Sequence, residues 1–492
     1  MYIIEFILII SVYIGIGEFN LIDNELVKLN DIGNNFFLTL ESLNKVKSSE
    51  LTKHLVELND NVKGRHLDLD ITSLLQQDTG FFNDYSGVVA HQINNDNIKL
   101  LSNICWELNI PLFLIKSTGF YSMLRIQLPE QTIINTHPQS IVDLRLNKPF
   151  KKLREFSSSI DLDKVDNYTF SHIPFIVILI KALDYWKQYH NSNPPLNLNQ
   201  KKEFKNLINS WRRPSVDGLN FDEAISQSYR AFQVTNVPEE TSKLFNDISL
   251  KNLSSTSNPF WYLVAALSEF VKLYSILPHP GTLQDFHTDT QTYVYLKSLY
   301  KDKSRIDSDV FKNLLKQVLS KFNKNIEELF TEDDINTFIK NSSNLKVIKG
   351  TKISDELTTP NKEKIINGLS DEFNNESFAI YVTFLAFDNF FIKNGRYAGD
   401  DPHSYDDDLT KLKEEVATLL KEKFNIDVVP SHVINVVGEF VRSAGSDLPT
   451  SAAFMGGLTS QEVIKVITNQ YIPIENTCIV NLIKSTTMVE KM

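Results

Sequence analysis

The sequence has little cysteine. Of its 492 residues only two, Cys105 and Cys478, are cysteines. Two thiols cannot build a disulfide framework or a four-thiolate zinc site, so a disulfide-rich secreted module and a zinc ribbon are excluded. Each cysteine lies in an apolar stretch, LLSNICWEL or NTCIVNLI. We interpret both as core residues and expect neither to be a nucleophile.

The sequence also lacks a surplus of basic residues. It has 50 Lys and Arg against 61 Asp and Glu, for a net charge of −11. Nucleic-acid binding needs a basic excess to meet the phosphates, so this composition argues against it. An acidic balance suits a protein with protein partners. With few cysteines, we expect a reducing compartment, the cytoplasm, with the nucleus also open.

Long apolar runs are scarce as well. The first stretch, MYIIEFILIISVYIGIG, is short for a bilayer span and carries Glu5. It has neither the basic start nor the small-residue cleavage site of a secretory signal. We therefore expect a buried strand here and no membrane anchor.

The chain is long enough for two or more domains, with 42% hydrophobic residues. Up to about residue 150, strand-like runs at 18–23, 87–90, 110–116 and 121–128 alternate with helical patterns at 48–58 and 97–108. Such alternation predicts an α/β fold with a mostly parallel sheet.

Helical spacing dominates from 151 to 430, in the segments 174–190, 260–274, 311–322, 376–393 and 408–424. The last part, 431–492, holds a small-residue helix at 447–467 and then strands at 472–483. We expect Gly456 and Gly457 in that helix to permit close approach to another element. The predicted organisation is a sheet domain, 1–150 and 431–492, interrupted by a helical insertion.

One segment near the start, GIGEFNLIDNELVKLNDIGNNFFL, carries functional signals. Gly15 and Gly17 precede the strand EFNLI, which ends at Asp23. An acidic residue at a strand end can hold a ribose hydroxyl. The glycines precede the strand, so they do not form the dinucleotide fingerprint.

This segment resembles the adenylation domain of ubiquitin-like-protein activating enzymes, which reads GIG, then DxD, then SNLNRQF. The helix AAFMGGLTSQEVIKVIT resembles that family's closing helix. STGFYSMLRIQL, THPQSIVDLRLNKPF and NGRYAGDD resemble the regulatory subunit of the neddylation activating enzyme. The resemblance runs from about Ile14 to the C-terminus. It implies a Rossmann-like pseudo-adenylation domain with a large helical insertion.

The resemblance also places this chain's substitutions at nucleotide-handling positions. Asn34, Asn35 and Phe36 stand where active members have Asn, Arg and Gln. A neutral amide and an aromatic ring cannot neutralise phosphate. His91, in VVAHQI, replaces a metal-binding Asp, and Mg²⁺ prefers hard oxygen ligands.

Two further positions of the family site are less altered. Glu25 takes the ribose position of the DxD motif. Lys47 matches the family's phosphate lysine, although an exposed helix lysine is the simpler interpretation.

The second half-reaction of the family needs a thiolate in the helical insertion, and 151–430 contains no cysteine. The resemblance therefore implies a non-catalytic, regulatory subunit without a cofactor of its own. ATP and Mg²⁺ would be bound by a catalytic partner in a heterodimer, and the ubiquitin-like modifier would be reached through that complex. Two alternatives stay open: a self-sufficient nucleotide-binding α/β enzyme, supported only by Gly15, Gly17 and Asp23, or a helical scaffold.

Contacts with the catalytic subunit can be carried over from the family at two places, which are His172 in SHIPF and the segment DFHTDTQTYVYLKS. The residues of that segment are Asp285, Phe286, His287, Thr288, Asp289, Thr290, Gln291, Thr292, Tyr293, Val294, Tyr295, Leu296, Lys297 and Ser298. Exposed aromatic residues suit an interface. The competing interpretation is a core stripe of Tyr293, Leu296 and Tyr300, with His172 capping a helix.

The family begins with a helix carrying YDRQ.R.WG and a strand, and MYIIEFILIISVY matches neither. A sheet without its first strand leaves an unpaired edge. We expect residues to be missing before Met1, and the alternative is that the apolar run forms a substitute strand.

Overall fold

The computed structural model describes residues 2–33, 35–77, 79–138, 142–371 and 375–492. The chain forms two compact units. Unit 1 comprises residues 1–131 and 347–492, and unit 2 comprises residues 132–346. Each unit is described by itself.

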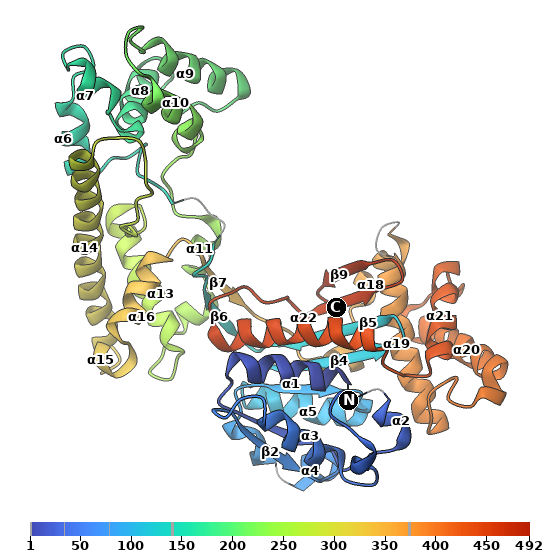
Figure 1. Ribbon diagram of the computed structural model, residues 1–492. Coiled ribbons are helices and arrows are strands. Elements are labelled where there is room, and N and C mark those ends of the chain that lie inside the picture. Colours follow the sequence, from blue (N-terminus) through green and yellow to red (C-terminus); the bar gives the residue numbers. More distant parts are fainter. Residues whose placement is uncertain (1, 34, 78, 139–141, 372–374) are drawn as a thin grey trace. The chain divides into compact units, whose positions relative to one another are not determined.

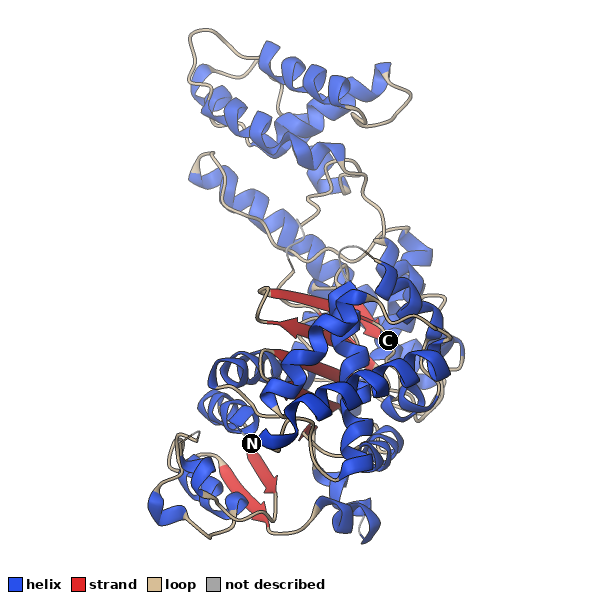
Figure 2. Cartoon of the chain, turned by 90° about the vertical axis from the view of Figure 1, so that its right-hand side faces the viewer, coloured by secondary structure: helices blue, strands red, loops and turns tan. Residues whose placement is uncertain are grey.

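Unit 1 is built around two sheets. Its strands are β1 (Glu18–Ile22), β2 (Lys63–Leu67), β3 (Val88–His91), β4 (Leu112–Thr118), β5 (Tyr121–Gln127), β8 (Thr477–Asn481) and β9 (Thr486–Glu490). β1 and β2 form a parallel pair, and the larger sheet has the order β3-β4-β5-β8-β9. Figure 2 shows the two short strands near the N-terminus set apart from the larger sheet. The strands predicted at 18–23, 87–90, 110–116 and 121–128 are present as β1, β3, β4 and β5.

The larger sheet mixes strand directions. β3 and β4 are parallel, with Val88 opposite Leu112, whereas β5, β8 and β9 join in antiparallel order. The direction reverses after β4 because Gly119, at φ +56°, forms a tight turn into β5. A Cβ at Gly119 would lie 2.1 Å from the Ser443 hydroxyl, so only glycine fits this turn. The parallel direction predicted from alternating strands and helices therefore holds at β1–β2 and β3–β4.

Helices cover the strands of unit 1. They are α1 (Tyr2–Ile14), α2 (Leu29–Ile32), α3 (Lys47–Val56), α4 (Ile71–Gln77), α5 (Asn95–Glu107), α17 (Ile353–Thr358), α18 (Lys362–Ser370), α19 (Asn375–Asn394), α20 (Tyr405–Phe424), α21 (Ser431–Ser443) and α22 (Pro449–Thr468). Short 3-10 helices span Leu40–Ser42, Thr79–Asp84 and Pro402–Ser404. Within the described residues, no helix is both long and apolar enough to cross a membrane.

The first stretch is the helix α1, so the prediction of a buried strand there was wrong. A run of aliphatic residues without periodicity suits either element, and here tertiary packing decides. α1 lies along α22 (Figure 1), and both helices join the core of β4, β5 and β8. The close approach predicted for the two glycines is present at Gly456, where a Cβ would lie 2.3 Å from Phe6 Cβ. A Cβ at Gly457 would meet no described atom within 4 Å outside its own helix turn, so this glycine makes no such approach.

The helices after residue 350 belong to the sheet unit. α19 is apolar around most of its surface, which is typical of a buried helix. It packs with α20, α21 and the sheet residues Tyr121, Met123 and Ile479 in one core. For this reason the compact units divide near residues 131 and 347, whereas the predicted helical domain extends from 151 to 430.

Unit 2 is helical. Its helices are α6 (Lys151–Ser159), α7 (Asn167–Ser171), α8 (Phe175–Tyr189), α9 (Leu198–Ser210), α10 (Leu219–Ser226), α11 (Glu239–Leu244), α12 (Ile248–Lys251), α13 (Pro259–Tyr274), α14 (Thr290–Ser320), α15 (Ile326–Leu329) and α16 (Glu332–Lys340), with a 3-10 helix at Gln227–Phe232. The apolar side of α8 packs on α9, α10 and the start of α14.

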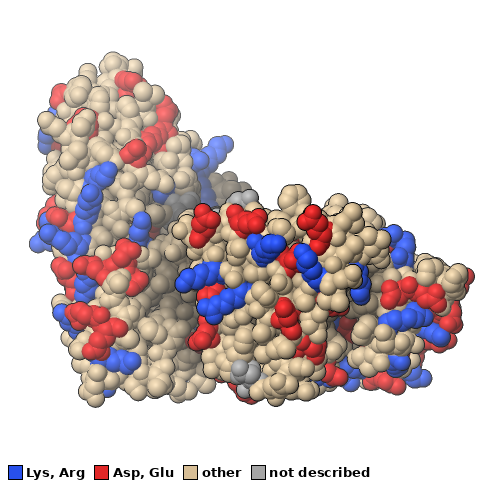
Figure 3. All heavy atoms as spheres, turned by 60° about the horizontal axis from the view of Figure 1, so that its bottom comes forward, with Lys and Arg blue, Asp and Glu red and all other residues tan. Residues whose placement is uncertain are grey.

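The chain enters and leaves unit 2 through β6 (Gln131–Ile134) and β7 (Leu345–Ile348), which pair with each other. Inside unit 2 the two ends are also joined, because the Asn135 N–H donates to the Asn344 carbonyl at 3.1 Å. On the face drawn in Figure 3, basic and acidic side chains are interspersed, in keeping with a modest net charge for 492 residues.

Candidate functional site

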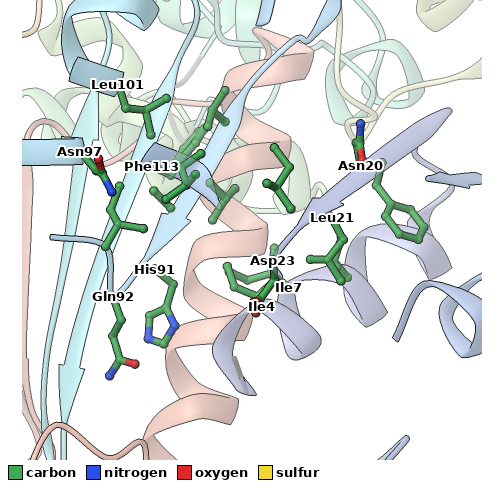
Figure 4. Close-up of a pocket in the computed structure, with 18 of the residues that line it drawn as sticks. Ile4, Ile7, Asn20, Leu21, Asp23, His91, Gln92, Asn97, Leu101 and Phe113 are labelled. Atoms are coloured by element: carbon green, nitrogen blue, oxygen red, sulfur yellow. The ribbon is translucent and has the colours of Figure 1, made fainter. Parts of the chain in front are cut away.

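A cavity of about 1750 Å³ lies in unit 1. It is lined by β1 and β3, by the loop after β1, and by residues of α1, α5 and α22. Figure 4 shows Asp23, after the end of β1, and His91, at the end of β3, near the same end of the cavity. The structure thus brings the nucleotide-handling positions of Asp23, Glu25, Lys47 and His91 to one cavity.

Lys47 is tied to carboxylates inside this site. Its Nζ lies 2.8 Å from Glu25 Oε2 and 3.2 Å from Asp31 Oδ1, and the residue is buried. The interpretation as an exposed helix lysine was therefore wrong. Burial works against the charged amine, but the hydrogen bond and charge of Glu25 and the charge of Asp31 prevail, so the pKa of Lys47 is raised. The charge of Lys47 is therefore neutralised by two carboxylates of the same chain.

The pKa values of the two acidic residues near Lys47, Asp23 and Glu25, shift in opposite directions. Burial raises the pKa of Asp23, whose Oδ1 accepts a hydrogen bond from the Glu25 N–H at 2.8 Å. The hydrogen bond from Lys47 lowers the pKa of Glu25. Glu25, the predicted ribose position, is therefore held as a carboxylate by Lys47.

Asn35 and Phe36, the two described residues at the positions of the family's NRQ motif, supply no positive charge to the site. Asn35 is buried, and its Oδ1 accepts from the Phe37 N–H at 3.0 Å. The Phe36 ring is 87% exposed, and its N–H donates to Glu5 Oε1 at 3.0 Å. Asn34 lies outside the described residues. Glu5 adds an acid that the sequence did not connect with this loop, and burial raises its pKa to about 7.

His91, at the predicted metal position, contacts a carboxylate from far along the chain. Its Nε2 lies 3.4 Å from Asp447 Oδ2, and both side chains are almost fully buried. Burial lowers the pKa of His91, which favours the neutral imidazole. Asp447 precedes α22 and is separated from His91 by more than 350 residues, so no sequence pattern could have linked them. The imidazole is thus directed to a protein carboxylate.

The charge around the cavity is strongly acidic. It is lined by seven carboxylate side chains and two basic ones. The acids are Glu18, Asp23, Glu25, Asp31, Asp70, Asp84 and Asp388, and the bases are Lys47 and Arg65. Arg65 is also paired, with its Nε 2.8 Å from Glu18 Oε1. Among the described residues, no group of three or more His, Cys, Asp or Glu side chains is arranged to hold a metal ion.

The glycine pair has a structural role between α1 and β1. Gly15, at φ +90°, follows the last turn of α1, and its N–H donates to the Ser11 and Val12 carbonyls at 3.1 Å. Gly17 leads into β1 and lines the cavity. As the sequence indicated, the pair stands before the strand and not at the start of a helix.

Both cysteines are buried and free. Burial raises the pKa of Cys105 to about 12 and that of Cys478 to about 11, so both remain thiols at neutral pH. They lie in α5 and β8, inside unit 1, as the prediction of core residues requires.

The predicted contact positions lie together in unit 2. Thr288 Oγ1 donates to the His172 carbonyl at 2.6 Å, and the rings of His172 and His287 stack with centroids 5.7 Å apart. The Asp289 side chain caps α14 by accepting from the Thr292 N–H at 2.9 Å. Two places separated by more than a hundred residues therefore form one local structure.

The competing interpretation holds for several of these residues. His172 ends α7, and its Nδ1 lies 2.8 Å from the Tyr168 carbonyl. Leu296 and Tyr300 are fully buried in the core of unit 2. The opposite side of α14 is exposed at Gln291, Val294, Tyr295 and Ser298, the spacing of one helix face. The interface assignment of this face stays a prediction.

The α/β fold, with the positions that match the adenylation motifs gathered at one cavity, is that of an adenylation-type protein, and comparison with protein families agrees. The model of the ThiF family matches residues 8–491, and the chain belongs to that family. The predicted Rossmann-like fold class is thereby confirmed. Among solved structures, Escherichia coli MccB with AMPCPP and MccA is 19% identical over 27% of this chain and 40% of that chain, with a TM-score of 0.24. That likeness is too small to support an argument.

Curated relatives identify the branch of the family. The NEDD8-activating enzyme E1 regulatory subunit of Gallus gallus is 33% identical, over 94% of this chain and 88% of the relative. Subunit AXR1 of Arabidopsis thaliana is 32% identical over 95% and 86%, and the Xenopus laevis protein 32% over 96% and 89%. The chain belongs to the family of NEDD8-activating enzyme E1 regulatory subunits, as the sequence motifs predicted.

Proposed function

We propose that this chain binds and supports the catalytic subunit of a NEDD8-activating enzyme as one half of a heterodimer. In this proposal the catalytic subunit holds ATP and Mg²⁺ and carries out both adenylation and thioester formation. The ubiquitin-like modifier reaches this chain only through the complex. The proposed location is the cytoplasm and also the nucleus, which imaging of a tagged chain tests.

The observation that carries the proposal is the charge of the cavity. An adenylation site brings together a nucleotide phosphate and a carboxylate, so Arg, Lys or Mg²⁺ must offset their charge. Here the two basic liners, Lys47 and Arg65, are paired with three of the lining carboxylates. Four further acids line the space, namely Asp23, Asp70, Asp84 and Asp388, and of these Asp388 is paired with Lys116. A triphosphate would meet repulsion in this cavity where an active site supplies attraction.

The exposed face of α14 supports the binding half of the proposal. Val294 is 58% exposed and Tyr295 50% exposed, while the helix is held from the other side by buried Leu296 and Tyr300. An aromatic and an aliphatic side chain on a rigid, capped helix suit a partner surface.

Pyrophosphate exchange tests the proposal directly. The purified chain alone is expected to give no ATP–pyrophosphate exchange above the blank, because its cavity cannot offset the phosphate charge. Addition of the catalytic subunit is expected to give modifier-dependent exchange. Exchange by this chain alone at the rate of the heterodimer would contradict the proposal and favour a self-sufficient nucleotide enzyme. Failure to bind any catalytic subunit would favour a scaffold.

A further inference from the structure

The chain between α13 and α14 forms neither helix nor strand over residues 275–289, and it overlaps the start of the predicted contact segment, 285–298. Loops of this length are uncommon in compact domains and are usually functional or disordered. Here Leu277 and His279 are buried, and Phe286 packs against the core of unit 2. The contacts that hold this loop therefore bear on how the contact segment is presented.

The first half of the loop is fixed by buried polar side chains. Arg145, which is 5% exposed, donates through Nη2 to the Leu277 carbonyl at 2.6 Å. The His279 N–H donates to Asp307 Oδ2 at 3.0 Å, and the Gly281 N–H donates to His279 Nδ1 at 2.9 Å. Burial lowers the pKa of His279 to about 3, so the ring is neutral near pH 7 and its Nδ1 can accept this bond.

The second half of the loop is held by Arg230, which lies in the 3-10 helix before α11. Its Nη2 donates to Gln284 Oε1 at 2.7 Å, its Nη1 to the Val142 carbonyl at 3.2 Å, and its Nε to Gln227 Oε1 at 2.7 Å. One guanidinium group thereby joins the loop to the 3-10 helix and to the chain before α6.

The charge of Arg230 has no carboxylate partner among the described residues. Arg230 is 9% exposed, and its three acceptors, two side-chain amides and one backbone carbonyl, are uncharged. Burial of a charge costs free energy, and uncharged acceptors offset only part of that cost. A gain in stability alone is therefore a weak reason for an arginine here. Its planar guanidinium fixes three acceptors in one geometry, which suits a positional role.

The end of the loop is tied to the other predicted contact position. The His287 N–H donates to Glu223 Oε2 at 3.0 Å, and Thr288 Oγ1 donates to the His172 carbonyl at 2.6 Å. The loop then ends at the cap of α14. The placement of residues 285–298 therefore depends on the conformation of the loop before them.

We propose that Arg230 is a positioning residue for partner binding, which holds the loop of residues 275–289 in the binding conformation before the catalytic subunit associates. This inference rests on the proposed function, since it takes residues 285–298 to contact that subunit. Ordering a loop during association lowers the affinity, and a loop that is already held avoids this cost. Loss of the Arg230 hydrogen bonds therefore weakens binding without loss of a direct contact to the partner.

A double-mutant cycle in the full chain tests the proposal. Arg230→Met removes three hydrogen bonds, and Gln284→Met removes only the acceptor on the loop. Gln284 is exposed, so its variants are expected to fold. Each single variant is expected to raise the Kd for the catalytic subunit about tenfold in isothermal titration. The double variant is expected to bind like Arg230→Met alone, because both changes break the same bond.

Two further variants show whether this hydrogen bond is the cause. Gln284→Glu keeps a side-chain oxygen that Arg230 can donate to, and it is expected to bind as tightly as the parent. Lys312→Met removes a basic side chain of α14 whose Nζ lies 2.6 Å from Glu332 Oε1. Lys312 lies about 30 Å along the helix from its first turn, so the Kd is expected to stay unchanged.

Hydrogen exchange separates an effect on the loop from an effect on the whole unit. The His287 amide reports the second half of the loop, and the His279 amide, bonded to buried Asp307, reports the core of the unit. Arg230→Met is expected to speed exchange at His287 about tenfold and to leave His279 unchanged, because the opening is local. A role in stability alone would instead lower the urea midpoint and leave the Kd as in the parent.

Three results would overturn the proposal. These are a Kd of Arg230→Met equal to that of the parent, additive effects in the double variant, and equal weakening by Gln284→Glu and Gln284→Met. Failure of the parent chain to bind any catalytic subunit would contradict the proposed function itself. The two failures are therefore distinguishable, because the first requires a parent that binds.

Discussion

Lys47 illustrates how two side chains change the chemistry of a site. The amine is in place, buried at the cavity, yet Glu25 and Asp31 lie within 3.2 Å of it. Glu25 is exposed, with 60% of its side chain accessible, so water screens its attraction to Lys47. Even so, the ion pairs direct the amine toward the protein's own carboxylates. This position therefore keeps the lysine of active relatives, but its amine is no longer available to bind phosphate.

Glu5 gives a pH-dependent prediction. Its pKa is about 7 in the folded chain against an ordinary 4.5, because of burial. Below pH 4.5 both states hold the proton. As pH rises further, only the unfolded state releases it, so stability falls until the folded carboxyl ionises near pH 7. Glu5→Gln removes this loss, and we expect the variant to gain roughly 2 kcal/mol over the parent between about pH 5 and about pH 8.

Urea unfolding followed by circular dichroism at the two pH values measures the gain. Glutamine keeps an oxygen that can accept the Phe36 N–H, so the comparison isolates the charge. Glu41→Gln, at an exposed position, is the matched control. An advantage of Glu5→Gln that does not change with pH would show that burial of the charge is not the cause.

The sequence identified most members of this site but not their partners. Asp23, Glu25, Lys47 and His91 were found because a family motif or a strand end marks them. Asp447 and Glu5 were not, because Asp447 comes from the far end of the chain and Glu5 sits in an apolar run. Contacts between residues far apart in the sequence form only in the tertiary structure, so a local sequence pattern cannot predict them.

At the scale of elements, periodicity predicted the strands β1, β3, β4 and β5 and the helices α3 and α5, whereas β2, α2 and α4 were not predicted and α1 was predicted as a strand. Its residues are apolar on nearly every side, so neither period 2 nor period 3.6 is visible. Strand direction beyond β4 was equally out of reach, because it depends on the turn at Gly119. The division into units depends on α19 packing against the sheet, which is again a tertiary contact.

The contact of α1 with α22 gives an element-scale prediction. Gly456→Ala places a methyl group 2.3 Å from Phe6 Cβ, so the helices must separate. We expect a loss of about 1–3 kcal/mol in the free energy of unfolding, as for overpacked cores. Gly457→Ala meets open space and gains helix propensity, so it is expected to be neutral or to stabilise by up to about 1 kcal/mol.

Chemical denaturation of the two alanine variants beside the parent measures the contrast. Because the residues are adjacent in one helix, the effect on helix propensity is shared and cancels. Equal stability of the two variants would mean that α1 is not held against α22 at Gly456.

At the scale of the whole molecule, the proposed function assigns one task to each of the two units. Unit 1 has the adenylation-type fold with a cavity of the wrong charge for phosphate, and unit 2 presents the exposed face of α14. Buried thiols and paired cations are consistent with a subunit whose part in the enzyme is to bind and support its partner.

Partner binding gives the prediction at this scale. Tyr295→Lys places a charge on the exposed face of α14, and we expect the Kd for the catalytic subunit to rise about tenfold or more. Ile306→Lys, on the same helix and with the same 50% exposure, is expected to leave the Kd unchanged.

Isothermal titration of each variant with the catalytic subunit gives the two constants, and circular dichroism confirms that the helical unit is intact. Equal weakening by both variants would indicate a general effect of charge on α14. Unchanged binding by both would remove this face from the interface.

The hydrogen bond between Asn135 and Asn344 joins the two ends of unit 2. A segment whose ends meet can be excised as a cassette, and a short turn can rejoin the flanking chain. The helical cassette and the rejoined sheet unit can therefore be produced as two reagents. If each reagent is tested as a competitor of the full chain for the catalytic subunit, the result shows whether one unit or both units provide the binding affinity.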